Sequence, residues 1–210
     1  MARCIIFSAG DYKGGYSKKD GDYIIAADAG YHHLEKLKIC PDMLLGDFDT
    51  IQSIPDHNNI ITFNKDKDYT DTELAVIEGI KMGFREFVIY GALGGKRLEH
   101  TIANIKLCES YSEKGCSVLI SDGDYYVTAL SNSQMTFSKD EKGYISVFSL
   151  SGKAEGVSIK GLKYELYKAD IDEKNPTLCV SNEFIGKDAA ISVEKGTVTI
   201  IWQRSIENEA

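Results

Sequence analysis

Residues 86–121 read EFVIYGALGGKRLEHTIANIKLCESYSEKGCSVLIS. The stretch begins and ends with short apolar runs, residues 86–90 and 117–121, and continuous runs of this length predict strands buried on both faces of a parallel sheet. Between them, a glycine-rich turn leads into an amphipathic segment from about residue 100 to residue 112, which we expect to be a helix. Strands that alternate with helices predict a layered α/β domain.

The same alternation extends toward the N-terminus. Two further apolar runs rich in isoleucine lie at residues 3–9 and 23–27, and a second amphipathic segment follows Thr70. Thr70 and Glu73 fit a capping box, which marks the start of a helix. We therefore expect an N-terminal α/β domain with a mainly parallel sheet over residues 1–130.

The pattern changes from about residue 131 onward. Strand-sized runs separated by Gly, Asp or Asn turns replace the helices, and no stretch has convincing helical periodicity. The expected strands are residues 144–150, 157–160, 178–181, 189–193 and 197–202. This predicts a C-terminal all-β sandwich or roll over residues 131–210, with Trp202 in its core.

Composition excludes several classes of protein. The 210 residues are 43% hydrophobic, which is enough for a folded core, and a net charge of -8 argues against non-specific nucleic-acid binding. No apolar run approaches the roughly 20 residues of a membrane span, and the N-terminus enters a strand-like run without a signal peptide. The five cysteines are odd in number and lack metal-ligand spacing, so neither a disulfide framework nor a zinc site is indicated. We expect a cytoplasmic protein that binds neither nucleic acid nor membranes.

Acidic side chains follow three successive apolar runs of the α/β domain. Asp28 follows the run at residues 23–27, and Asp47 and Asp49 follow the run at residues 43–45. Asp68 and Asp71 follow the run at residues 60–63. Ligands of open α/β sheets bind beyond the carboxyl ends of the strands, so these carboxylates should gather at one edge. Two unit charges about 4 Å apart repel by roughly 4 kcal/mol at an effective dielectric of about 20, so such a cluster needs a cation, a cationic ligand or a proton to offset the repulsion. Oxygen ligands without His or Cys suit Mg²⁺. The alternative is that these aspartates are turn formers and helix caps.

The glycine-rich segment at residues 91–100 reads GALGGKRLEH and lies between a predicted strand and a helix, where backbone N–H groups can bind phosphate. It is one residue short of a P-loop, and Arg97 replaces the Ser or Thr that follows the P-loop lysine. Arg97 could hold a phosphate through its fork of donors, and His100 and Asn104 share one helical face with i, i+4 spacing. A glycine turn with exposed basic residues is an equally good interpretation.

Together, these motifs resemble those of bacterial-type thiamin pyrophosphokinases. In the N-terminal half the matching segments are DAG at 28–30, PD at 41–42, GDFDT at 46–50, KDYTDTELA at 67–75 and residues 94–104. In the C-terminal half they are GLKYEL at 161–166 and SNE at 181–183. The chain departs from the family pattern at Ala29, which replaces a glycine, at Lys96, and at Glu99, where the family usually has Asp.

The resemblance implies a catalytic α/β domain, a thiamin-binding β domain and a homodimer with active sites between subunits. It implies transfer of a pyrophosphoryl group from ATP to the hydroxyethyl oxygen of thiamin, with Mg²⁺, and release of AMP. Asp47, Asp49 and Asp71 are then expected to hold Mg²⁺ on the triphosphate. Asp28 and Asp68 could orient the metal shell or the nucleophilic hydroxyl.

The remaining candidates are expected to neutralise charge or to bind thiamin. Lys67 and Arg97 would neutralise charge on the transferred group and on departing AMP. Tyr164 would stack on a thiamin ring by cation–π attraction, and Ser181 and Asn182 would bond to the aminopyrimidine. Two alternatives stay open: a diphosphokinase acting on another heterocyclic alcohol, such as a hydroxymethylpterin, and a nucleotide- or metabolite-binding regulatory protein without turnover.

Overall fold

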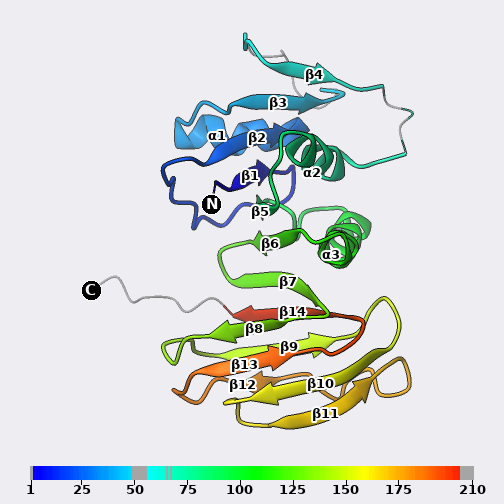
Figure 1. Ribbon diagram of the computed structural model, residues 1–210. Helices are drawn as coiled ribbons and strands as arrows, with labels where there is room; N and C mark the ends of the chain where they lie inside the picture. Colours follow the sequence, from blue (N-terminus) through cyan, green and yellow to red (C-terminus); the bar gives the residue numbers. More distant parts are fainter. Residues whose placement is uncertain (1, 49–55, 65, 67, 204–210) are drawn as a thin grey trace. The chain divides into compact units, whose positions relative to one another are not determined.

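The computed structural model describes residues 2–48, 56–64, 66 and 68–203 (Figure 1). The chain divides into two compact units. The first comprises Met1–Asn104 and Cys116–Gly123, and the second comprises Ile105–Gly115 and Asp124–Ala210. The functional boundary expected between residues 130 and 131 stays a prediction.

The first unit is built on six parallel strands in the order β6-β5-β1-β2-β3-β4 (Figure 1). Their bounds are β1 (Cys4–Phe7), β2 (Tyr23–Ala27), β3 (Met43–Gly46), β4 (Ile60–Thr62), β5 (Glu86–Tyr90) and β6 (Ser117–Ser121). Both apolar runs that flank the opening segment are strands, and they pair directly with each other. The predicted parallel sheet is confirmed.

The sequence predicts two of the helices of this unit, and it gives no prediction for the helical segment at residues 28–37. The helical elements are the 3-10 turn η1 (Asp28–Gly30), α1 (Tyr31–Leu37), α2 (Asp71–Lys81) and α3 (Leu98–Glu113). At the start of α2, the Glu73 backbone N–H donates to Thr70 Oγ1 at 3.2 Å, so the predicted cap is confirmed. The helix expected from about residue 100 begins slightly earlier, and its residues from Ile105 onward belong to the second unit.

The two faces of the parallel sheet are covered by different helices. Successive strand residues point to opposite faces. Ile5 and Phe7 lie in a fully buried cluster with Leu34 of α1. On the other face, a Cβ at Gly79 of α2 would lie 2.6 Å from Phe87 and 3.1 Å from the Cys4 sulfur, so only glycine lets α2 approach this closely. A sheet covered on both faces needs the continuous apolar runs from which it was predicted.

The second unit is a β-sandwich. One sheet has the order β12-β9-β14-β7 and the other β11-β10-β13-β8, with antiparallel pairings. The bounds are β7 (Tyr125–Ser131), β8 (Gln134–Phe137), β9 (Tyr144–Phe148), β10 (Ala154–Lys160), β11 (Leu166–Ile171), β12 (Asn182–Glu183), β13 (Ala189–Ser192) and β14 (Thr197–Gln203). Trp202 of β14 is buried, and its ring centroid lies 5.4 Å from that of Phe137 in the other sheet. The predicted all-β region and the core position of Trp202 are confirmed.

One expected strand of the second unit is wrong. Residues 178–181 lie in turns that precede the two-residue strand β12. The Asn175 side chain accepts from the Asp172 N–H at 2.9 Å, and the Asn175 carbonyl accepts from the Leu178 N–H at 3.1 Å. Local bonds of this kind compete with strand pairing, so the apolar character of the run does not decide its conformation.

The five cysteines are all free, and four of them are buried as small apolar side chains. Across the part of the chain that the structure describes, no helix is long and apolar enough to cross a membrane.

Candidate active site

A cavity of about 450 Å³ lies in the first unit, beyond the carboxyl ends of β1, β2 and β5. Its lining comes from the segments that follow these strands and from the first turns of α2 and α3. The residues expected from the sequence that line it are Asp28, Asp71, Arg97, His100 and Asn104. The cavity therefore joins two of the predicted carboxylates to the glycine-rich segment.

The segment after β1 holds the glycine-rich loop in place. The Gly10 N–H donates to the Gly91 carbonyl at 2.7 Å, and the Asp11 N–H donates to the Leu93 carbonyl at 3.2 Å. The Asp11 carboxylate accepts from the Gly95 N–H at 2.9 Å. Gly91 has a φ of 65°, and a Cβ there would lie 2.4 Å from the Ser8 carbonyl oxygen, so the two segments approach too closely for any other residue.

The acidic residues do not all lie at the cavity. Asp28 follows β2 directly and Asp71 begins α2, and both line it. Asp47 is not among the lining residues, but a Cβ at the preceding Gly46 would lie 3.1 Å from Asp28 Cα, so the chain of β3 passes against Asp28. Asp68 is exposed and also outside the lining. Asp49 and Lys67 lie outside the described residues.

Arg97 is oriented by a neighbouring carboxylate, that of Glu99. Its Nε donates to Glu99 Oε1 at 2.8 Å, and both side chains are about two-thirds exposed. This hydrogen bond lowers the pKa of the Glu99 carboxyl. The Glu99 carboxylate therefore stays charged near neutral pH and holds one edge of the guanidinium.

Asn104 has a structural part at the cavity. Its side chain is almost fully buried, and its Nδ2 donates to the Ala92 carbonyl at 2.7 Å, which ties α3 to the glycine-rich loop. His100 lies one turn earlier and also lines the cavity. The expected sharing of one helical face is consistent with both residues lining the same cavity.

Three cavity residues are missing from the sequence-based prediction. Ser8 and Thr72 join β1 to α2 through a buried hydrogen bond of 2.9 Å between their hydroxyl oxygens. Asp11 supports the glycine-rich loop. Ser8 and Asp11 follow β1, so the rule that selects Asp28 after β2 could have selected them. The role of Asp11 depends on a loop 84 residues away, which no local pattern reveals.

The thiamin-side candidates lie together in the second unit. Tyr164 is 62% exposed, whereas Asn182 is buried and exchanges hydrogen bonds with the Tyr164 main chain. Ser181 has a φ of 57°, and its N–H donates to Ser146 Oγ at 3.0 Å. Lys163, next to Tyr164, forms a 2.6 Å ion pair with Glu183, and this hydrogen bond raises the pKa of the lysine.

The donor set of the first unit suits a hard cation. The structure contains no group of three or more His, Cys, Asp or Glu side chains placed to hold a metal among the residues it describes. Asp28 and Asp71 nevertheless offer carboxylate oxygens to one cavity that is also lined by Lys96 and Arg97. Mg²⁺ commonly uses one or two carboxylates and completes its shell with water and phosphate, so the residues present fit that ion.

Comparison with known proteins identifies the family. A model described as the catalytic domain of thiamin pyrophosphokinase matches residues 16–120, and one described as the vitamin B1 binding domain of the same enzyme matches residues 132–198. The chain belongs to the thiamin pyrophosphokinase family. The catalytic-domain match contains Asp28, Asp71 and Arg97, and the vitamin B1 binding match contains Tyr164 and Asn182.

Individual thiamin pyrophosphokinases agree with this assignment. The thiamine pyrophosphokinase of Bacillus subtilis (strain 168) is 28% identical over 184 residues, which cover 84% of this chain and 85% of that protein. Its crystal structure is similar with a TM-score of 0.82 at 24% identity, covering 98% of this chain and 100% of that one. The enzymes from Geobacillus thermodenitrificans (TM-score 0.81, 24% identity, 99% of each chain) and Candida albicans (TM-score 0.75, 15% identity, 97% of this chain and 89% of that one) share the fold.

Proposed function

We propose that this chain transfers the pyrophosphoryl group of ATP to the hydroxyethyl oxygen of thiamin, giving thiamin diphosphate and AMP. The observation that carries the proposal is that one cavity of a thiamin pyrophosphokinase fold is lined by Asp28, Asp71 and the glycine-rich loop. Carboxylates for a metal and basic groups for phosphate thus meet at one place. The protein is proposed to work in the cytoplasm, where its five free thiols stay reduced.

The phosphates are proposed to bind at the glycine-rich loop. Lys96 and Arg97 supply positive charge to the cavity. The bond to Glu99 uses only Nε of Arg97, and the guanidinium has two further nitrogens with which to hold a phosphate. Glu99 therefore works as an orienting partner for the arginine at a position where the family usually has the shorter Asp.

The aspartates are proposed to hold Mg²⁺ against the triphosphate. Asp71 is the proposed ligand inside the cavity, and Asp47 and Asp49 are proposed as further ligands; of these two, Asp47 directly follows β3, which passes against Asp28. Mg²⁺, when bound, neutralises negative charge on the phosphates during transfer. Asp28 and Asp68 are proposed to orient the metal shell or the hydroxyl of thiamin.

The transfer itself makes and breaks one bond. The hydroxyethyl oxygen of thiamin forms a bond to the β-phosphorus of ATP, and the bond from that phosphorus to the oxygen shared with the α-phosphate breaks. AMP leaves with the bridging oxygen, and the hydroxyl proton passes to an aspartate of the cavity or to water. Positioning and charge neutralisation by Lys67 and Arg97 are the protein's main contributions to such a step.

Thiamin is proposed to reach this cavity from the second unit, across the subunits of a homodimer. The exposed ring of Tyr164 would stack on the cationic thiazolium, a contact of about 0.5–2 kcal/mol, and Ser181 would bond to the aminopyrimidine. Mixing an inactive Asp71→Asn chain with an inactive Tyr164→Ala/Ser181→Ala chain should then restore activity, because a mixed dimer rebuilds one intact site. If mixed chains exchange subunits, as shown with two affinity tags, and activity does not return, the site lies within one chain.

The proposed function is tested by AMP release. The full-length protein is incubated with ATP and Mg²⁺ and with thiamin, a hydroxymethylpterin or no acceptor, and AMP is quantified by chromatography. Thiamin-dependent AMP release supports the proposal. Release that depends on the pterin identifies a related diphosphokinase, and tight ATP binding without AMP from either acceptor identifies a regulatory protein.

A further inference from the structure

Asn182, in β12 of the second unit, uses its side chain to hold another residue. It is 4% exposed, and its Oδ1 accepts from the N–H groups of Tyr164 at 3.0 Å and Glu183 at 2.9 Å. Its Nδ2 donates to the Tyr164 carbonyl at 2.7 Å. An amide oxygen has two lone pairs and an amide nitrogen two N–H groups, so these bonds use the whole acceptor capacity and half the donor capacity.

Tyr164, the residue that Asn182 holds, has a hydrogen-bonded main chain and an exposed side chain. Both main-chain polar groups of Tyr164 bond to the Asn182 amide, whereas Tyr164 as a whole residue is 62% exposed. Two residues before it, Leu162 is 2% exposed and pairs with Phe184 as an isolated bridge. A rigid backbone beneath an exposed ring lowers the entropy lost when a ligand stacks on that ring.

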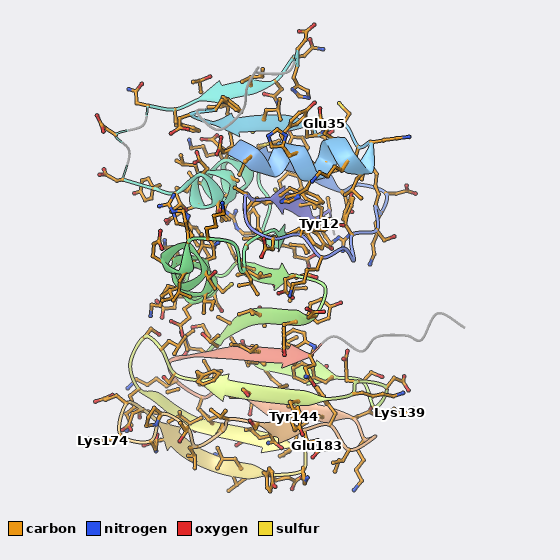
Figure 2. The ribbon with its side chains drawn as sticks, turned by 180° about the vertical axis from the view of Figure 1, so that it is seen from behind. Tyr12, Glu35, Lys139, Tyr144, Lys174 and Glu183 are labelled. Atoms are coloured by element: carbon orange, nitrogen blue, oxygen red, sulfur yellow. The ribbon has the colours of Figure 1, made fainter. Side chains whose placement is uncertain are left out.

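A second attachment secures the same segment on its other side. The Lys163 N–H donates to the Glu183 carbonyl at 3.0 Å, and Lys163 Nζ pairs with Glu183 Oε2 at 2.6 Å. The Lys163 ammonium lies 5.7 Å from the centre of the Tyr164 ring. Figure 2 shows Glu183 beside Tyr144, its cross-strand partner on β9, whose ring is also exposed. Residues of β12 thus hold the main chain of both Lys163 and Tyr164.

We propose that Asn182 is a positioning residue: it fixes the main chain of Tyr164 so that the exposed ring is presented to a flat, cationic ligand, and it does not itself bind that ligand. The inference rests on the proposed function, because thiamin is the flat cation concerned. It replaces the expectation that the Asn182 amide bonds to the aminopyrimidine, since the buried amide is occupied by the protein backbone.

The test compares Asn182→Ala with Asn132→Ala. Asn132 is a matched control in the same unit, because its Oδ1 also accepts from a backbone N–H, but from that of Gly196 at 2.9 Å and not from that of Tyr164. Amide hydrogen exchange of Tyr164 is measured by NMR in the full chain, with steady-state KM values for thiamin and ATP. Asn182→Asp, which keeps the acceptor and loses the donor, serves if Asn182→Ala does not fold.

The expected result is selective. Asn182→Ala should speed exchange of the Tyr164 amide and raise KM for thiamin about fivefold, as expected for loss of one net hydrogen bond, with KM for ATP unchanged. Asn132→Ala should alter neither quantity. In the double variant with Tyr164→Ala, the rise in KM should equal that of Tyr164→Ala alone, because Asn182 acts only through the ring.

Each other outcome overturns the inference in a recognisable way. An unchanged rate of amide hydrogen exchange at Tyr164 in Asn182→Ala would show that the hydrogen bonds from the Asn182 side chain do not protect this segment. Additive effects in the double variant would show that Asn182 contacts thiamin directly. If the wild-type protein neither binds thiamin nor releases AMP with it, the proposed function falls, whereas a normal wild type with an unaffected Asn182→Ala variant removes only the positioning role.

Discussion

Asp11 offers the sharpest test of how the phosphate-binding loop is held. Its carboxylate accepts from the Gly95 N–H at 2.9 Å, and it also brings a negative charge to a cavity that is proposed to bind ATP. Two variants separate these effects. Asp11→Asn and Asp11→Ala both remove the charge, but only Asn retains an oxygen that can accept from Gly95.

The difference between the two variants therefore measures the hydrogen bond. A neutral hydrogen bond contributes about 1 kcal/mol net, which corresponds to roughly a fivefold change in affinity. Asp11→Ala should accordingly show a KM for ATP about fivefold above that of Asp11→Asn, because the loop must be ordered at the expense of binding. KM for thiamin should be the same in both variants.

The assay is the initial rate of AMP formation at varied ATP and saturating thiamin and Mg²⁺, with dissociation constants for ATP from calorimetry as a check. Asp56→Ala, an exposed aspartate before β4 and outside the cavity, is the control and should behave like wild type. Equal ATP affinities in the two Asp11 variants would refute the reasoning, because the carboxylate would then hold nothing that ATP binding needs.

Three further perturbations test other parts of the account. Gly91→Ala should lower the unfolding temperature far more than Gly115→Ala. Both glycines have positive φ, but of the two only Gly91 would place a Cβ 2.4 Å from a carbonyl oxygen, that of Ser8. Equal unfolding temperatures in the two variants would show that this close approach does not constrain the residue at position 91. Burial lowers the pKa of His33 from its ordinary value near 6.5, so the free energy of unfolding in urea should be highest above pH 6.5 and fall as the pH drops below it, with a smaller fall in His33→Gln. Arg97→Lys should raise KM for ATP without changing the unfolding temperature, because a lysine keeps the charge but lacks the fork of donors; a lower melting temperature with normal kinetics would make Arg97 structural.

The secondary structure that could be predicted is the part that local sequence controls. The parallel strands follow from apolar runs that are buried on both faces, and the start of α2 follows from Thr70, whose hydroxyl caps the Glu73 N–H. The run at residues 178–181 looks like a strand, but main-chain bonds from the Leu178 N–H to the Asn175 carbonyl and from the Val180 N–H to the Thr177 carbonyl fold it into turns. Periodicity cannot detect such bonds.

The residues of the candidate site also differ in whether local sequence could identify them. Asp28 could be selected because it directly follows β2, and Asp71 because it comes after the apolar run that contains β4. Asp11 and Asn182 owe their roles to partners 84 and 18 residues away, so only the folded chain reveals them. The metal-binding and catalytic roles of the aspartates stay predictions.

The central claim is that two phosphates move together from ATP to thiamin, and ³¹P NMR of the reaction mixture tests it most directly. The account predicts that thiamin diphosphate and AMP appear in equal amounts, without ADP, and that Asp71→Asn abolishes both signals while the protein stays folded. Formation of thiamin monophosphate with ADP, or AMP and pyrophosphate without any thiamin product, would contradict it.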